Sequence, residues 1–240
     1  LVIDPVLEYS RYFGGSKADI SYAVDLDAAG NIYVIGSSAS AGLATPGAYG
    51  QAPGQRGEVF SYPYCFDCAE APGQGVQVER VEIDITRSVL VSKFSADGGS
   101  LIWSTYVNAA PQQNLTHGMN SAAVSDAGEV AFGIDQAPDG LPLANDTQSF
   151  APDEINVYVA KLNATGSGLV FGTYLHLGGT NGFVWLRGLD VSATGDVAVS
   201  GMLSGNNTFP VLIGIPGQSC EMNLAESENS DGFVALFSSA

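Results

Sequence analysis

The chain has 240 residues, of which 45% are hydrophobic and 14% are charged, and its 25 acidic and 8 basic residues give a formal net charge of −17. This composition supports a globular core, and the negative charge argues against binding to nucleic acid or to anionic membrane surfaces. No run of about 18 apolar residues occurs, so we expect no membrane insertion.

Three sequence features recur in the same order along the chain, and together they mark an internal repeat. The first is an aromatic strand that ends in Tyr, at residues 7–12, 101–106 and 169–174. The second is a hairpin with a Gly in its turn and a β-rich strand after it, at residues 23–36, 123–133 and 189–201. The third is a strand of alternating apolar residues, at 89–94, 157–162 and 233–237.

The spacing of the repeat is regular in the second half of the chain and longer in the first. Tyr106 and Tyr174 are 68 residues apart, as are Lys93 and Lys161. Tyr12 and Tyr106 are 94 residues apart, so the first copy carries about 26 additional residues.

The additional residues fall within a segment at about 37–88, where Pro, Gly, Gln and Cys accumulate and strand periodicity disappears. We expect this segment to project from the surface as a long excursion. Its aromatic residues, set among Gly and Pro, are typical of a surface that contacts a partner. They are Tyr49, Phe60, Tyr62, Tyr64 and Phe66.

Each copy predicts four short strands with Gly, Asn or Asp at the turns, and no segment longer than about ten residues has a clean helical period. The predicted fold class is therefore all-β, a β-propeller-type array of three four-stranded antiparallel blades. The expected blades are residues 1–96, which include the insertion, 97–164 and 165–240.

Three blades are too few for a closed propeller, which usually has four to eight, so we expect part of a larger or assembled propeller. The chain begins at Leu1 without a Met and ends without a tail, so we also expect a longer precursor. Further blades of that precursor or other copies of the chain should cover the apolar end faces. We expect Tyr9, Tyr12 and Val24 on one end face, and Val197, Val199, Phe233 and Val234 on the other.

These motifs resemble a bacterial β-propeller repeat family, the SBBP repeat. Residues 9–15 resemble its Y-S-T-Y-L-G-G element, and residues 45–49 resemble its T-x-G-A-Y element. Residues 27–36 and 91–106 resemble the two elements that remain, whereas Leu236 replaces the family's Lys in the last copy. The resemblance implies a propeller architecture and export to the cell surface or the extracellular space, and it assigns no common catalytic residues.

The first hairpin contains a calcium candidate, Asp25, Asp27 and Asn31. Two carboxylates and an amide around a Gly-containing turn supply the oxygen ligands that calcium prefers. The alternative is an ordinary β-turn in which Asp27 bonds local amides, and the related turns of the other copies lack the second acid. No cofactor is required by the sequence, and calcium is the one that it suggests.

Because the resemblance implies export, we expect two of the three cysteines to form a disulfide. A bridge between Cys65 and Cys68 is favoured, and a bridge from Cys220 to one of them is the alternative. Ala69 replaces the His that a c-type haem motif requires after its second Cys, which excludes haem attachment.

No residue pattern indicates catalysis. His117 and His176 have no nucleophile motif beside them, and the acids at 79, 82 and 84 are typical of a solvated strand face. Four Asn-x-Ser/Thr motifs are glycosylation candidates on turns, at Asn114, Asn145, Asn163 and Asn206. The recurring aromatic residues indicate packing between blades in preference to carbohydrate stacking. They are Tyr12, Tyr106, Tyr174, Trp103 and Phe171.

Two classes of function follow from these observations. The leading hypothesis is a non-enzymatic structural or interaction module that is secreted or held at the cell surface and associates through its blade faces and loops. The alternative is a polysaccharide-binding protein or a polysaccharide-active enzyme on a propeller scaffold. The expected partners are further blades or copies of the chain, with other surface proteins or polysaccharide next.

Overall fold

A computed structural model describes residues 7–64, 76–85, 87–108, 121–146, 148–152, 154–176, 182–205 and 230–238. Within these ranges the chain forms antiparallel strands and no helix, which confirms the all-β prediction. The same residues therefore contain no helical segment with the length and apolarity needed to cross a bilayer.

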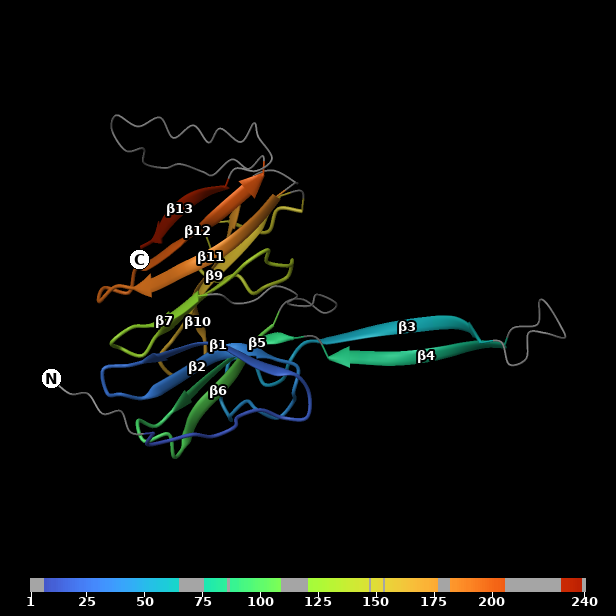
Figure 1. The fold of residues 1–240 in the computed structure, drawn as a ribbon, viewed down its shortest axis with the longest axis horizontal. Coiled ribbons are helices and arrows are strands. Elements are labelled where there is room, and N and C mark those ends of the chain that lie inside the picture. Colours follow the sequence, from blue (N-terminus) through green and yellow to red (C-terminus); the bar gives the residue numbers. More distant parts are fainter. Residues whose placement is uncertain are drawn as a thin grey trace.

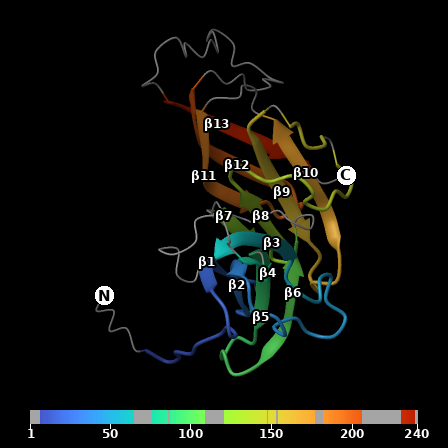
Figure 2. The same ribbon diagram turned by 90° about the vertical axis from the view of Figure 1, so that its right-hand side faces the viewer.

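The strands form three main sheets, stacked one after another, and one separate hairpin (Figures 1 and 2). The first sheet has the order β1 (Asp19–Leu26), β2 (Ile32–Ser38), β5 (Ser88–Phe94), β6 (Leu101–Val107). The second has the order β7 (Ser121–Val124), β8 (Val130–Ile134), β9 (Asn156–Leu162), β10 (Leu169–His176). The third has the order β11 (Gly182–Val191), β12 (Val197–Gly205), β13 (Ser230–Phe237). Strands β3 (Gln55–Tyr64) and β4 (Val76–Ile85) pair with each other.

The sheets do not begin and end at the blade boundaries that we expected from the repeat. We expected boundaries near residues 96 and 164, but the first sheet extends to Val107 and the second to His176. The reason is that each aromatic strand forms a hairpin with the strand before it, β6 with β5 and β10 with β9. A sequence period fixes the length of the repeat but not the strand with which a sheet starts.

This shift changes the composition of the two end sheets. Residues 7–12, the first copy of the aromatic strand, precede β1 and belong to none of the described sheets. The third sheet consists of three described strands, one fewer than we expected.

The insertion forms a regular element, contrary to the expectation that strand periodicity disappears there. Strands β3 and β4 each have 10 residues, and Figure 1 shows their hairpin extending away from the three sheets. Antiparallel backbone pairing stabilises such a ribbon whatever its apolar pattern, which is why composition did not reveal it. At its base, the backbone N–H of Gly54 donates to the Oγ of Ser88 over 2.8 Å.

Two apolar clusters hold the three sheets together. The cluster between the first and second sheets includes Ile35, Val91 and Phe132, and the cluster between the second and third includes Val159 and Val199. Neighbouring residues of a strand point to opposite faces, so β8 and β9 each contribute to both clusters. The second sheet is therefore buried on both sides.

The end faces carry partly different residues from those expected. Val197 and Val199 are buried against the second sheet, and Phe233 packs there too. Val234 and Leu236 point the other way, with 70% and 67% of their surface exposed. Because adjacent strand residues alternate between faces, Phe233 and Val234 cannot share one, and our grouping of them was wrong.

The buried second sheet gives a first prediction. Phe132→Ala should lower the free energy of unfolding by about 3 to 5 kcal/mol, because it removes a fully buried ring at the first junction. Urea unfolding followed by tryptophan fluorescence measures the change. Ile102→Ala, at a position about half exposed, is the control and should change stability by less than about 1 kcal/mol. Equal losses in the two variants would contradict this description of the core.

Candidate functional site

The turn between β1 and β2 is organised around Asp27. Its carboxylate accepts hydrogen bonds from the backbone N–H groups of Ala29 and Asn31, at 3.0 and 2.9 Å. It also accepts one from the Asn31 side-chain amide at 2.9 Å, and the Lys93 ammonium lies 2.9 Å from Oδ2. Burial alone would raise the pKa of the Asp27 carboxyl, but the hydrogen bonds from Asn31 and Lys93 outweigh it and hold the pKa well below its usual range.

The other carboxylate of the calcium candidate bonds to a different place. Asp25 accepts hydrogen bonds from the backbone N–H of Leu26 at 2.8 Å and from that of Val124, in the second sheet, at 2.7 Å. Asp25 therefore links two sheets, while Asp27 and Asn31 close the turn. No group of three His, Cys, Asp or Glu side chains comes together as a metal site among the described residues.

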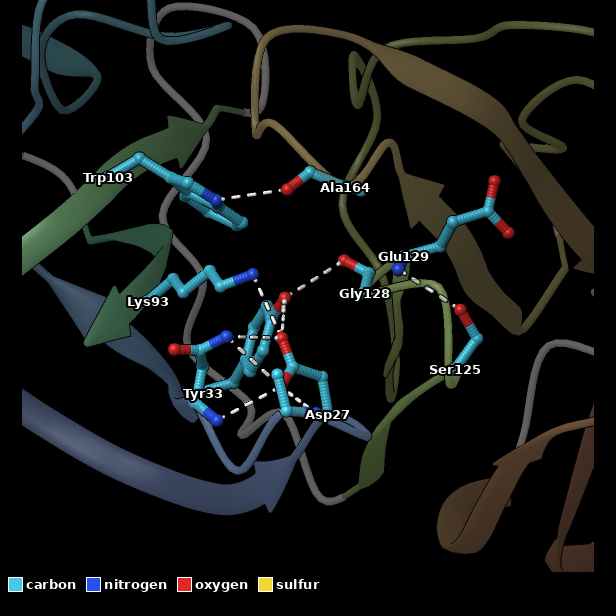
Figure 3. A network of polar contacts seen from close by, with 10 residues as sticks. Asp27, Tyr33, Lys93, Trp103, Ser125, Gly128, Glu129 and Ala164 are labelled. Carbon is cyan, nitrogen blue, oxygen red and sulfur yellow. Dashed lines mark hydrogen bonds and ion pairs between the residues drawn. The ribbon is translucent and has the colours of Figure 1, made fainter. Parts of the chain in front are cut away.

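Asp27, Asn31, Lys93 and Tyr33 form one polar cluster, the Asp27 cluster, and Tyr33 connects it to the second sheet (Figure 3). The Tyr33 hydroxyl lies 3.2 Å from Oδ2 of Asp27 and 3.3 Å from the carbonyl oxygen of Gly128, in the turn between β7 and β8. The Lys93 ammonium lies 4.9 Å from the centre of the Tyr33 ring, which adds a cation–π contact. A polar side chain of the first sheet thus contacts the turn of the next.

The equivalent turn carbonyl of the third sheet also accepts a hydrogen bond from the sheet before it, but from a lysine instead of a tyrosine. Lys161, the equivalent of Lys93, donates to the carbonyl oxygen of Gly195 over 2.8 Å and pairs with Glu129 over 2.9 Å. Gly195 lies in the turn of the third sheet, at the position that Gly128 occupies in the second. The equivalent residue in β13 is Leu236, which is exposed. The outer face of the third sheet thus carries an apolar residue where both junctions carry a lysine.

An aromatic residue at the start of each closing strand makes a second kind of contact between sheets. The indole N–H of Trp103 donates to the carbonyl oxygen of Ala164 over 3.1 Å. A methyl group added at Gly166, which has a φ of +65°, would lie 2.5 Å from the Trp103 ring, so only Gly fits. In the next junction, Phe171 stacks on Phe237 with ring centres 5.9 Å apart. The expectation that these aromatic residues pack between sheets is confirmed for these positions.

The tyrosine at the sixth position of β6 and of β10 bonds to a loop of its own sheet. The Tyr106 hydroxyl donates to the carbonyl oxygen of Ser40, and the Tyr174 hydroxyl donates to that of Pro138 over 2.7 Å. Both rings are buried. Burial raises the pKa of Tyr174 to about 12, so this hydroxyl remains a donor at neutral pH.

Residues 7–12 make the same kind of contact with the first sheet that Trp103 makes with the second. A methyl group at Gly98, the equivalent of Gly166, would lie 2.5 Å from the Tyr9 ring. Arg11 donates to the carbonyl oxygen of Gly98 over 3.2 Å. Tyr9 thus lies against the first sheet as Trp103 lies against the second, whereas Tyr12 is fully exposed.

A hollow of about 280 Å³ separates this segment from the outer face of the first sheet. Phe13 packs edge to face on Phe94 at one side of it, with ring centres 5.1 Å apart. Its lining is partly apolar, with Ile32, Val34 and Leu90, and partly polar, with Asp19 and Ser92.

The predicted interaction residues of the insertion are divided. Tyr49 is partly exposed, and its backbone N–H donates to the carbonyl oxygen of Gly166 over 2.9 Å, so it contributes to the junction between the first two sheets. Phe60, Tyr62 and Tyr64 lie in β3, whose backbone alone is described. Three predicted features lie outside the described residues: Phe66, the favoured Cys65–Cys68 bridge, and Cys220.

Two of the four glycosylation candidates are described. Asn145 is exposed and donates to the carbonyl oxygen of Val170 over 2.9 Å, and Asn163 accepts a hydrogen bond from the backbone N–H of Ser167 over 3.0 Å. Both side chains thus form hydrogen bonds with the backbone. Asn114, Asn206 and His117 lie outside the described residues, and the His176 ring contacts the carbonyl oxygen of Ser149.

Sequence reasoning missed Tyr33, Lys93 and Lys161 as the residues that join the sheets. The signal was present, because both lysines recur at the same place in strands that are otherwise apolar. A lysine that recurs at the same position of an apolar strand in two copies of a repeat indicates a buried partner, since an unpaired ammonium is costly to bury.

The Asp27 cluster gives a prediction about acid stability. The pKa of the Asp27 carboxyl in the folded chain lies below its unfolded value of about 4. The ionised carboxylate therefore adds to the free energy of unfolding above that pH, and this stabilisation is lost as the pH falls further. Asp27→Asn should lower the free energy of unfolding at pH 7 by about 2 kcal/mol. Urea unfolding between pH 6 and pH 2 should then show a smaller acid loss in the variant than in the unmodified chain. Asp126→Asn, in an exposed turn position, is the control, and parallel pH profiles for the Asp27 variant and the unmodified chain would contradict the prediction.

The arrangement of three stacked sheets with repeated junctions agrees with a comparison against known protein families. A search of curated proteins finds no match to the chain. Residues 8–44, which include the aromatic segment, β1 and β2, match the family model of the SBBP beta-propeller repeat. The chain therefore carries a beta-propeller repeat of the SBBP family at residues 8–44, within an all-β stack of antiparallel sheets.

Proposed function

We propose that this chain is a non-enzymatic structural and interaction module of the cell surface or the extracellular space. It associates with further sheets of the same kind, supplied by other copies of the chain, through the outer faces of its first and third sheets. One observation carries the proposal: large apolar side chains are exposed on the outer faces of both end sheets.

The outer face of the third sheet resembles an interior surface. Phe183 and Trp185 stack on it with ring centres 5.5 Å apart, beside the exposed Val234 and Leu236. The residues of the other sheets equivalent to Val234 are Val91 and Val159, and both are fully buried at junctions. The surface of Val234 is thus of the kind that a further sheet covers elsewhere in this molecule.

The outer face of the first sheet is its counterpart. Val24 and Leu26 are 69% and 56% exposed there, and their strand partners Val34 and Ile32 line the hollow under the segment of Tyr9, Arg11 and Phe13. The two faces differ in sequence and shape, so a contact between them is heterologous, and its repetition gives a closed ring or an open filament.

An extracytoplasmic location is part of the proposal. It is supported by the SBBP repeat, which resembles modules of exported bacterial proteins, and by a net charge of −17, which favours solubility.

The proposal is tested by charging one face. Val234→Asp combined with Leu236→Asp should abolish self-association, because burial of two carboxylates in an apolar contact is strongly unfavourable. Sedimentation velocity over a range of concentrations measures the association, and circular dichroism checks that the sheets remain folded. Leu143→Asp, in an exposed loop of the second sheet, is the control and should associate normally. The proposal is wrong if the unmodified chain remains monomeric throughout, or if the doubly charged variant still associates.

A further inference from the structure

The projecting hairpin has strand edges that no described strand covers. β3 and β4 pair with each other in a continuous register, without a bulge. Neither strand packs extensively against any other described element, and the ribbon lies clear of the three sheets (Figure 1). A ribbon of two strands is only marginally stable by itself in water, and an unpaired edge is a template for another strand. A third strand would therefore stabilise this ribbon.

The root of the ribbon is attached to the first sheet. The Asn108 side chain, just after β6, donates to the carbonyl oxygen of Ala52 over 2.8 Å. Gly54, the residue before β3, donates to Ser88, the first residue of β5. A strand edge that is presented from a fixed root loses less conformational freedom on binding than a free loop does.

Pro63 shows which backbone groups of the ribbon face outward. Proline has no N–H, so its pair with Gln77 cannot be one of the pairs that exchange hydrogen bonds across the ribbon. Because the two kinds of pair alternate, every second pair from this one also directs its N–H and C=O groups to the free edges. On β4 these residues are Gln77, Glu79, Val81, Ile83 and Ile85.

The edges of the two strands are not equivalent. The β3 edge lacks the N–H of Pro63 and includes Gly57, and both residue types are unfavourable in a strand. β4 contains no proline or glycine, and half of its 10 residues are Val or Ile. Its outward backbone groups recur about every 6.8 Å, which is also their spacing in any other extended strand. The chemical complement of the β4 edge is therefore an extended polypeptide.

The sequence of β4 also indicates the charge of that polypeptide. Three of its positions are acidic, Glu79, Glu82 and Asp84, whereas Arg80 is its one basic residue. Side chains directly opposite each other on neighbouring strands interact, and opposite charges stabilise the pair. The net charge of −17 adds a long-range attraction for a basic partner.

We propose that β4 binds an extended basic segment of a partner protein, which pairs antiparallel with β4 as a third strand of the ribbon. The antiparallel direction is the more stable one for each residue paired. Apolar residues of the partner lie opposite Val81 and Ile83, and basic residues lie opposite Glu82 and Asp84. This contact is separate from the outer faces of the first and third sheets, and its partner is not another copy of the chain.

A synthetic peptide tests the pairing. In V-K-V-K-V-T-K-V-T, the lysines lie opposite Asp84, Glu82 and Glu79 when the first residue pairs with Ile85. With a fluorophore at its N-terminus, the peptide should show a rise in fluorescence anisotropy when the chain is added. The control peptide V-E-V-E-V-T-E-V-T has the opposite charge and should bind at least about tenfold more weakly. Equal affinity for the two peptides, or no binding of the basic one, overturns the inference.

Two proline variants show where the peptide binds. Val59 and Val81 lie opposite each other, and each directs its backbone groups to the free edge of its own strand. Val81→Pro removes a donor from the β4 edge, and Val59→Pro makes the same change at the β3 edge and is the control. The basic peptide should bind Val81→Pro at least about tenfold more weakly than the unmodified chain, and Val59→Pro within about twofold. The same affinity for all three chains, or equal losses in the two variants, contradicts strand addition at β4.

The variant with charged outer faces separates this inference from the proposed function. Val234→Asp combined with Leu236→Asp should bind the basic peptide normally, because β4 is unchanged. Val81→Pro should leave any association of copies in sedimentation velocity unchanged. Loss of peptide binding in the variant with Asp at positions 234 and 236 would locate the peptide on the third sheet and overturn the inference, whether or not copies of the chain associate.

Discussion

A β-sheet that is apolar on both faces has to be covered on both sides, and the architecture of this chain follows from that constraint. In β8 and β9 the residues that alternate between faces are apolar in both positions, so the second sheet is stable only with a sheet on each side. The first and third sheets also carry apolar side chains on both faces, and among the described residues each packs against the second sheet. Burial of apolar faces therefore explains the stacking of the sheets, and it is the same physical cause on which the proposed association rests.

Apolar contact alone does not set how one sheet lies on the next. The polar links do so, because each requires a side chain of one sheet to meet one backbone group of the following turn. Tyr33 meets Gly128 and Lys161 meets Gly195, while Asp25 meets the N–H of Val124. A hydrogen bond has a preferred angle, whereas contact between apolar surfaces is non-directional. The polar links therefore specify the orientation of the sheets, and the apolar clusters supply most of the stability.

The sequence was sufficient to predict the all-β class, the length of the repeat and the packing role of Trp103 and Phe171, because all three appear as periodic patterns. It was not sufficient to predict where a sheet starts, since any strand of a periodic chain is an equally good origin. It also misled about Val197 and Val199, because residues 197–199 are all apolar and so do not reveal which of them face outward. The β3–β4 hairpin was missed because its strands are set in a segment whose composition is typical of a loop.

The hydrogen bond between Gly54 and Ser88 has a consequence for the evolution of the chain. It holds the two ends of the hairpin segment next to each other where β5, an inner strand of the first sheet, begins, so the distance that the segment must span is independent of its length. Closing a longer loop costs only about 0.6 kcal/mol for each doubling of its length. Between these two residues the chain can accept insertions, deletions or an exchanged recognition element while the stacked sheets keep their packing, and variation among related proteins should concentrate there.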